Sequence, residues 1–238
     1  MNEGIIKTVK DFIKSYSHKN THVKVDLTEE LRLEEALINA GVENPESVLK
    51  LTIGGIMIRR DFKYIRKKMN NTLQEIDIKN TLLEENRIPS RAFDRCEALT
   101  SIIMPDSIVE IRKKAFSDCS SLTSITIPDT VFEIGVLAFY RCVSLTSINI
   151  PDKVTEINFR TFAECTGLTS IVIPDTITKI GSAAFSNCTS LVSITIPDKD
   201  IEIGNYAFFN CTSLSSESIP KRLAKIGEGA FDKEFDSF

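Results

Sequence analysis

The sequence predicts a repeat solenoid, in which each turn of the chain adds one strand to a parallel β-sheet. Three residue types recur every 23 residues between positions 93 and 231. Proline stands at 105, 128, 151, 174, 197 and 220, cysteine at 96, 119, 142, 165, 188 and 211, and phenylalanine at 93, 116, 139, 162, 185, 208 and 231. A fixed period of about 20 to 50 residues is typical of a solenoid or a similar array.

The composition is that of a folded chain without a membrane-spanning helix, because no apolar run is long enough to cross a bilayer. The net charge is −4 and Lys and Arg are dispersed. This argues against a nucleic-acid partner, since such proteins usually carry a basic face. The N-terminus lacks the apolar core of a signal peptide. Either the protein stays inside the cell, or its leader has been removed.

Residues 1–46 are expected to form a small α/β cap with two helices and a short strand, because the first turn would otherwise expose its core. The spacing of apolar residues over 5–16 predicts a helix, which either packs on the protein itself or contacts a partner or membrane surface. Alternation over 23–27 predicts the strand. A second helix is expected after Thr28, whose side chain would cap it, and should end at Gly41.

Two irregular turns, longer than 23 residues, are expected before the regular repeat. Residues that match the later strand pattern are Val48, Leu51 and Ile53, and then Leu73, Ile76 and Ile78. Between them, residues 61–69 have helical spacing, with Phe62, Ile65 and Met69 facing inward. We therefore assign 47–231 to the solenoid and 232–238 to a C-terminal end or truncated cap.

Each regular repeat divides its residues between core and surface. In the repeat that starts at Leu122, the first, fourth and sixth residues are apolar and face inward, and the residues between them face outward. Proline ends the strand because it has no N–H for the ladder, and the aspartate that follows suits a turn. Gly135 permits a tight bend, while Ala138 and Phe139 fill the back of the coil.

The six cysteines occupy one column of the repeat, in the frame Phe-x-x-Cys. Free cysteine behaves as a small buried hydrophobe, so we expect reduced core thiols, although pairing between adjacent turns is geometrically allowed. The absence of Cys-x-x-Cys and of a nearby His argues against a zinc site. A cation ladder along the aspartates at 106, 129, 152, 175 and 198 is conceivable, but turn formation explains them. We expect no metal and no cofactor.

The combination of Ala-Phe-x-x-Cys with Leu-Thr-Ser-Ile-x-Ile-Pro resembles the BspA-like leucine-rich repeat family, whose units have 23 residues. It is clearest in 134–142 and 145–151, and the resemblance covers about 47–231. The family implies a right-handed solenoid with a parallel sheet on its concave side and short turns or helical pieces on the back. It also implies a surface-exposed or secreted protein that takes part in adhesion, with a host matrix or surface protein as partner.

Two outward-facing columns of the sheet are the candidate protein-binding residues, because concave solenoid sheets are common binding surfaces. They are Ser101, Ser124, Ser147, Ser170, Ser193 and Ser216, and Ile103, Thr126, Asn149, Val172, Thr195 and Ser218. The second column varies most and is the better candidate. A solvated sheet face without a partner would also fit, since both columns lack the Trp, Tyr and Arg that favour binding hot spots.

Two positions near the C-terminal end break the repeat. Asp200 and Glu217 stand in columns that are otherwise apolar, and burying an unpaired carboxylate costs several kcal/mol. Either Ile201 replaces Asp200 in the core and Glu217 turns outward, or Glu217 forms a polar contact with Lys221 or Arg222 that marks a partner or cap site.

An enzyme is the least supported function class. The chain has no Gly-x-Ser-x-Gly, phosphate-loop or His-Glu-x-x-His motif, and its two histidines, His18 and His22, lie in the predicted cap. We expect no catalytic residue. The sequence favours a protein-binding module at the cell surface, with an intracellular scaffold as the alternative, and we assume a monomer.

Overall fold

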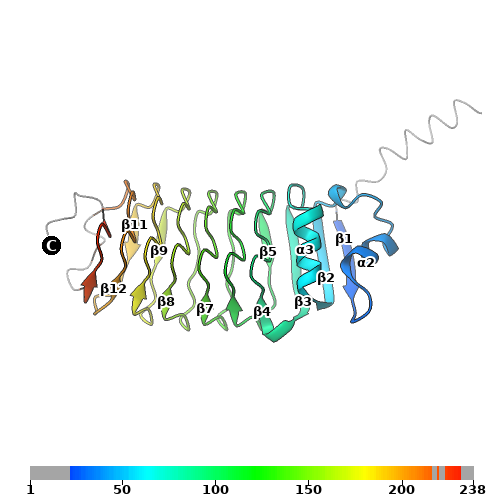
Figure 1. Ribbon diagram of the computed structural model, residues 1–238, viewed down its shortest axis with the longest axis horizontal. Helices are drawn as coiled ribbons and strands as arrows, with labels where there is room; N and C mark the ends of the chain where they lie inside the picture. The colour runs from blue at the N-terminus through cyan, green and yellow to red at the C-terminus, as the bar shows by residue number, and fades with distance from the viewer. Residues whose placement is uncertain (1–21, 216–218, 220–222, 232–238) are drawn as a thin grey trace, which may run out of the picture.

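The computed structural model describes residues 22–215, 219 and 223–231, which form an elongated solenoid of stacked turns (Figure 1). We call each turn a rung. The helical elements are α2 (Leu33–Asn39), η1 (Pro45–Ser47), α3 (Arg59–Lys68) and η2 (Glu84–Asn86). The strands are β1 (His22–Leu27), β2 (Lys50–Met57), β3 (Glu75–Leu83), β4 (Arg87–Ile88), β5 (Ser101–Ile103), β6 (Glu110–Ile111), β7 (Glu133–Ile134), β8 (Glu156–Ile157), β9 (Ser170–Val172), β10 (Lys179–Ile180), β11 (Ser193–Thr195), β12 (Glu202–Ile203) and β13 (Lys225–Ile226).

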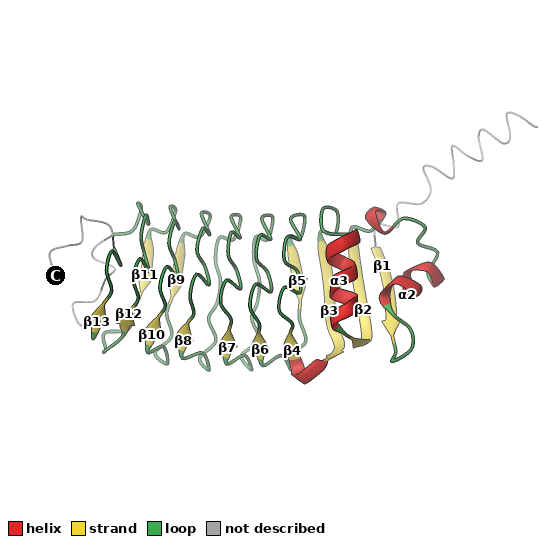
Figure 2. Ribbon diagram, in the orientation of Figure 1, coloured by secondary structure: helices red, strands yellow, loops and turns green. Residues whose placement is uncertain are grey.

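Four strands form a parallel sheet in the order β1-β2-β3-β5. Together with the parallel pair β9 and β11, further along the same side of the solenoid (Figure 2), we call it the wide sheet. Leu51 lies opposite Ile76, and Ile76 lies opposite Ile102. The two irregular turns are therefore in the predicted phase. Helix α3 lies in front of β2 and β3 in Figure 1, and it buries Phe62 and Ile65 as predicted. The helix predicted over 5–16 lies outside the described residues, and the boundaries of the proposed cap stay a prediction.

The predicted cap of the second helix is wrong. The hydroxyl oxygen of Thr28 accepts from the N–H of Leu31 at 3.0 Å, which makes a separate turn before α2 begins. Instead, a carboxylate of the neighbouring helix α3 caps the start of α2. Asp61 is 1% exposed, and its side chain accepts from the N–H of Leu33 at 3.0 Å. The predicted end is confirmed, because Gly41 has a φ of 78°.

A second ladder of two-residue strands runs along another side of the solenoid (Figure 2). Its strands pair in parallel in the orders β4-β6-β7 and β8-β10-β12-β13. Ile88 lies opposite Ile111, which places the start of the regular phase where the sequence predicted it. Gly135 lies at the corner that follows. An added Cβ there would meet the backbone nitrogen of Lys113 at 2.7 Å, so close approach between rungs requires the glycine.

The back of each regular rung consists of tight turns, and the described part of 89–231 contains no helix. These turns form a third hydrogen-bonded ladder. The N–H of Phe116 donates to the carbonyl oxygen of Ala138 at 2.8 Å, and that of Lys114 donates to Val136 at 3.0 Å. To aim these groups, the residues two before and two after each phenylalanine from Phe93 to Phe208 adopt φ values of 51–65°, although none is glycine.

Arg66 of α3 covers the first rung of this ladder. Its guanidinium donates to the carbonyl oxygens of Arg91 and Ala92. These carbonyls belong to the first back turn, which has no regular rung before it. In the next rung, the carbonyl equivalent to that of Ala92 accepts from the preceding rung, as Ala115 does from Phe93. At Ala92 the helix therefore supplies the donor that a preceding rung would otherwise supply.

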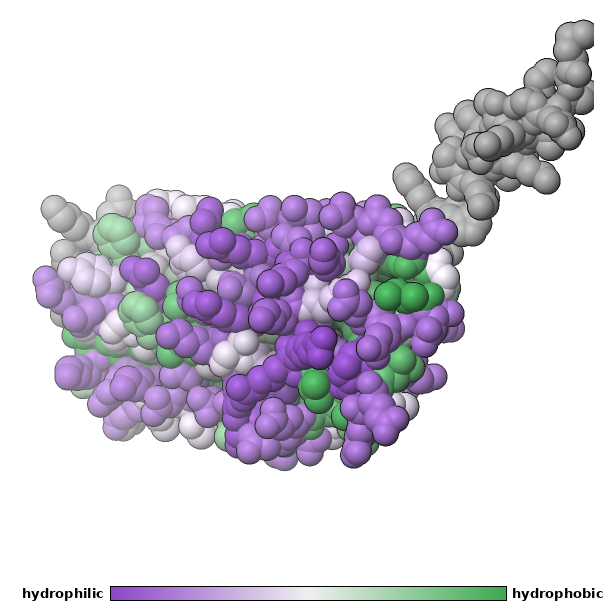
Figure 3. All heavy atoms as spheres, turned by 45° about the vertical axis from the view of Figure 1, so that its right-hand side comes forward, coloured by the Kyte–Doolittle hydropathy of each residue, from purple (hydrophilic) through white to green (hydrophobic). Residues whose placement is uncertain are grey.

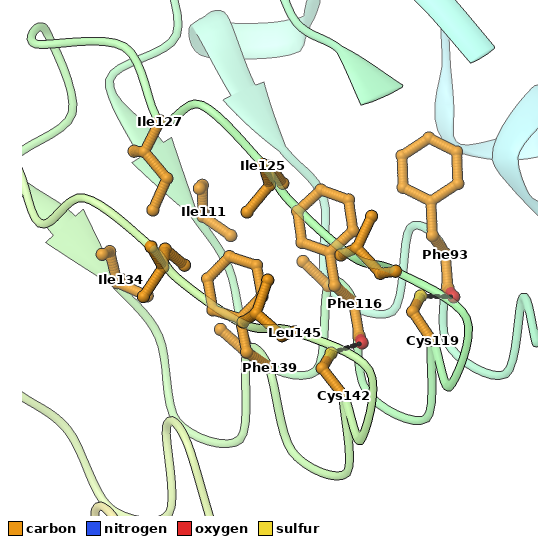
Figure 4. Close-up of a cluster of buried hydrophobic side chains, with 14 of the residues drawn as sticks. Phe93, Ile111, Phe116, Cys119, Ile125, Ile127, Ile134, Phe139, Cys142 and Leu145 are labelled. Atoms are coloured by element: carbon orange, nitrogen blue, oxygen red, sulfur yellow. Dashed lines mark hydrogen bonds between the residues drawn. The ribbon is translucent and has the colours of Figure 1, made fainter. Parts of the chain in front are cut away.

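The phenylalanine column stacks through the centre of the solenoid. From Phe93 to Phe231, neighbouring rings are 5.2–5.6 Å apart between centroids and nearly parallel, at 3–15°. Phe62 of α3 meets the first ring of this stack edge-on, at 5.5 Å and 82°. Figure 4 shows part of the stack with Ile125, Ile134 and Leu145 packed around it. The helix thus closes the apolar core at its N-terminal side.

Candidate functional site

The two candidate columns lie at the surface of the wide sheet. Their described members are exposed, apart from the half-buried Ser101, while Ser216 and Ser218 lie outside the described residues. Two members are apolar: Val172 is 66% exposed and Ile103 is 52% exposed. These two apolar side chains stand among Ser, Thr and Asn side chains in the two columns.

The sheet beneath these columns is interrupted, which differs from the expected single sheet. Residues 124–126 and 147–149 keep the alternation of buried and exposed side chains, yet they form no strand between β5 and β9. The side-chain amide of Asn149 spans part of this gap. Its Oδ1 accepts from the N–H of Ile127 and its Nδ2 donates to the Ile127 carbonyl, both at 3.1 Å. Asn149 therefore replaces a pair of backbone bonds.

A shallow depression of about 450 Å³ lies where this interrupted segment meets β9. It brings together four of the twelve candidate residues, Ser147, Asn149, Ser170 and Val172. Asp152 is the one acidic side chain among the residues that line it. The depression offers hydroxyl donors and acceptors around an exposed apolar side chain, which suits contact with a protein surface. The remaining candidates lie elsewhere along the face.

The cysteine column has a role that the sequence analysis missed. All six thiols are free and buried, as expected, but five of them also donate to the carbonyl oxygen of a phenylalanine in the preceding rung, at 3.1–3.2 Å. Burial raises the pKa of Cys96 and of Cys165 to about 12. The thiols therefore stay protonated, and the fixed Phe-x-x-Cys spacing was the available signal.

The break at Asp200 follows the simpler prediction. Ile201 is fully buried in its place, and Asp200 is exposed. The turn tightens to allow this, because the N–H of Lys199 donates to the Pro197 carbonyl at 2.9 Å. Elsewhere in this column the third residue after proline donates instead, as Ile177 does to Pro174. Glu217, with Lys221 and Arg222, lies outside the described residues.

The cationic residues are less evenly dispersed than the sequence analysis assumed. Six of the ten residues of α3 are Lys or Arg, and four of them, Arg60, Lys63, Lys67 and Lys68, line a cleft between α2 and α3. Among the described residues, no three His, Cys, Asp or Glu side chains gather as metal ligands would. Within the same residues, no helix has the length and apolar character needed to cross a bilayer.

Three solved structures share the fold. A leucine-rich repeat protein of T. pallidum is 23% identical, with 84% of this chain and 81% of that chain covered and a TM-score of 0.56. A leucine-rich repeat protein of Eubacterium ventriosum is 17% identical, with 92% and 84% covered and a TM-score of 0.55. One of Bacteroides ovatus is 21% identical, with 81% and 66% covered and a TM-score of 0.59. Such identities show the fold alone.

Sequence comparison gives the family. No curated protein matches the chain. The model of the BspA type leucine rich repeat region matches in six copies, over residues 63–192 and 133–236, which together span most of the chain. Leucine-rich repeats of this kind are protein-interaction modules, and the repeat found in the sequence is the one that the family model describes. The chain belongs to the BspA-type leucine-rich repeat family.

Proposed function

We propose that this chain is a non-enzymatic protein-binding module whose partner contacts the depression formed by Ser147, Asn149, Ser170 and Val172. The observation that carries the proposal is the exposure of Val172, which presents an apolar side chain, 66% exposed, in a polar hollow. Protein interfaces combine such an apolar centre with a polar, hydrogen-bonding rim. The other members of the two columns would extend the contact along the face.

The chemistry of the depression supports binding over catalysis. Asp152 is the one titratable side chain among its lining residues. A general acid or base must lie within hydrogen-bond reach of the proton that it transfers, and Asp152 is the one such group that this hollow offers. Among the described residues, no hydrogen bond joins Asp152 to the hydroxyl of Ser147 or Ser170, so neither hydroxyl is paired with a base that would activate it as a nucleophile.

We further propose that the protein is surface-exposed or secreted and mediates adhesion to a host matrix or surface protein. Membership of the BspA-type family supports this choice of partner class. The alternative is an intracellular scaffold that uses the same face. A leader peptide in the full reading frame would favour the first, and a frame that starts at Met1 without one would favour the second.

Binding to immobilised collagen, laminin, fibronectin and fibrinogen, measured by biolayer interferometry, tests the adhesion proposal. For whichever of the four proteins binds the wild type, we expect Val172→Lys to weaken binding by about tenfold or more, because the variant places a charge at the apolar centre of the contact. Val192→Lys is the matched control, since Val192 is 55% exposed but does not line the depression. Absence of binding to all four proteins contradicts the adhesion role. Equal effects of the two variants contradict the site.

A further inference from the structure

A cleft of about 360 Å³ lies between α2 and α3, at the N-terminal end of the solenoid. Its lining contains five cationic and three acidic side chains, together with Tyr64. In Figures 1 and 2, α3 lies on the side facing the viewer, whereas β5, β9 and β11 lie behind the turns. The cleft is thus distinct from the candidate sheet face. The side turned to the viewer in Figure 3, which includes α3, is predominantly hydrophilic.

Most cations of this cleft have no acidic partner. Arg60, Lys63, Lys67 and Lys68 form no ion pair with any residue that the structure describes. Their spacing of three and four residues places Arg60, Lys63 and Lys67 along one side of α3, over about 10 Å. This row of positive charge stands out in a chain with a net charge of −4.

Arg32 adds a buried donor pair to the same cleft. Its side chain is 11% exposed, and its Nη1 lies 3.3 Å from Oδ2 of Asp61. Nε and Nη2 are buried and donate to no acceptor in the described part of the chain. These two nitrogens form the side of a guanidinium that binds both oxygens of one carboxylate. A buried donor without an acceptor is destabilising, so a ligand that supplies one is favoured.

We propose that the α2–α3 cleft binds the carboxylates of an acidic peptide segment on a partner protein. Alternate residues of an extended peptide lie about 7 Å apart on one side, so two carboxylates fit within the row from Arg60 to Lys67, which is about 10 Å long. A third carboxylate would bind the free side of Arg32 once a side-chain movement exposes these buried nitrogens. A single phosphate group would engage one end of the row, so an extended acidic chain is the better match.

Fluorescence anisotropy tests this site with a labelled peptide in which Ser-Glu is repeated four times, at low salt. A peptide with Gln in place of Glu is the control ligand, and we expect it not to bind. Lys63→Glu/Lys67→Glu should weaken binding of the Glu peptide by about tenfold or more, because attraction becomes repulsion. Lys113→Glu/Lys153→Glu changes the net charge equally at exposed positions outside the cleft, and should weaken it by less than about twofold.

Arg32→Lys tests the buried donors. It keeps a cation beside Asp61 but removes the bidentate side of the guanidinium, and should weaken peptide binding by about threefold to tenfold. Wild-type affinity in this variant would overturn the role of Arg32. Equal binding of both peptides, equal losses in the two double variants, or stronger binding to phosphatidylserine vesicles or single-stranded DNA would overturn the site. If Lys63→Glu/Lys67→Glu fails to fold, Lys63→Gln/Lys67→Gln replaces it. Val172→Lys should leave peptide binding unchanged, which separates the two proposals.

Discussion

The thiol of Cys142 donates to the carbonyl oxygen of Phe116 in the preceding rung, across 3.2 Å. Within one repeat the phenylalanine and the cysteine are three residues apart. The hydrogen bond, however, joins the cysteine to the phenylalanine of the preceding rung, so it links neighbouring rungs. Cys96 is equally buried but belongs to the first regular rung, and no hydrogen bond from its thiol is present among the described residues. Among the described residues, Cys142 therefore makes a thiol hydrogen bond to a phenylalanine carbonyl that Cys96 does not make.

Replacement of these two cysteines by alanine should measure that bond. Both variants lose the same buried sulfur, but Cys142→Ala also leaves the Phe116 carbonyl without its donor. We expect Cys142→Ala to lower the free energy of unfolding by about 0.5–1 kcal/mol more than Cys96→Ala does. Urea denaturation followed by circular dichroism checks the difference. Equal losses in the two variants would show that the thiol acts as an apolar filler alone.

Stability should fall at alkaline pH because of the same column. Burial raises the pKa of Cys96 and of Cys165 to about 12, from an ordinary value of 9.0. The folded protein thus holds these protons more tightly than the unfolded chain does. Their contribution is complete below about pH 9 and is lost progressively as the pH rises towards 12. Urea midpoints measured from about pH 8 to about pH 11 should decrease.

The variant Cys96→Ala/Cys165→Ala removes two of the thiols that give this pH dependence. Burial also raises the pKa of Cys119 and of Cys142, and these thiols remain in the variant. Tyr64 and Tyr140 also have raised pKa values, caused first by burial, and they remain in the variant. We expect the variant to lose less stability than the wild type over the same pH interval. An identical pH dependence in the two proteins would contradict the assignment to the thiols.

The phenylalanine stack should dominate the core energetics. Phe139 is fully buried between Phe116 and Phe162, so Phe139→Ala should lower the free energy of unfolding by about 3–5 kcal/mol. Phe132 lies in the same rung but is 47% exposed, and Phe132→Ala should cost less than about 0.5 kcal/mol. Chemical denaturation of both variants checks the contrast. A similar cost for the two would argue against a stack-centred core.

Asn149 should stabilise the interrupted sheet. Its amide makes two hydrogen bonds to the Ile127 backbone, so Asn149→Ala should cost about 1–2 kcal/mol. Thr126 stands in the same column, exposed, and Thr126→Ala should change the stability by less than about 0.5 kcal/mol. Thermal unfolding of the two variants provides the comparison. If Asn149→Ala costs no more stability than Thr126→Ala, the two hydrogen bonds from Asn149 to the Ile127 backbone add no stability.

The periodic part of the fold was predictable because each column has one chemical task. A residue type that returns every 23 positions must meet its own copies in neighbouring rungs, and this fixed the rungs and the core positions. The departure at Ile201 was also predictable, because an apolar residue stood next to Asp200. In the candidate site, exposure of Val172 followed from the alternation of the strand.

Contacts between distant residues were not predictable in this way. Asp61 caps a helix that begins at Leu33, and no local pattern joins these positions, so the nearer Thr28 was chosen. The missing strand pairing at 147–149 has a similar cause, since this segment has nearly the same sequence as segments that do form strands. The presence of Asn at position 149 was the one local sign of the interruption. The sequence does not show that its amide makes two hydrogen bonds to the backbone of Ile127.

The back ladder that begins under Arg66 has a direction. The N–H groups around Phe116 donate to the next rung, so one end of the stack presents carbonyls and the other presents amides. The two ends are chemically distinct, and a cap built for one would not serve the other. A whole 23-residue cassette inserted between two regular rungs would meet matching groups on both sides. Duplication of a repeat within the array would therefore lengthen the protein without requiring a new cap at either end.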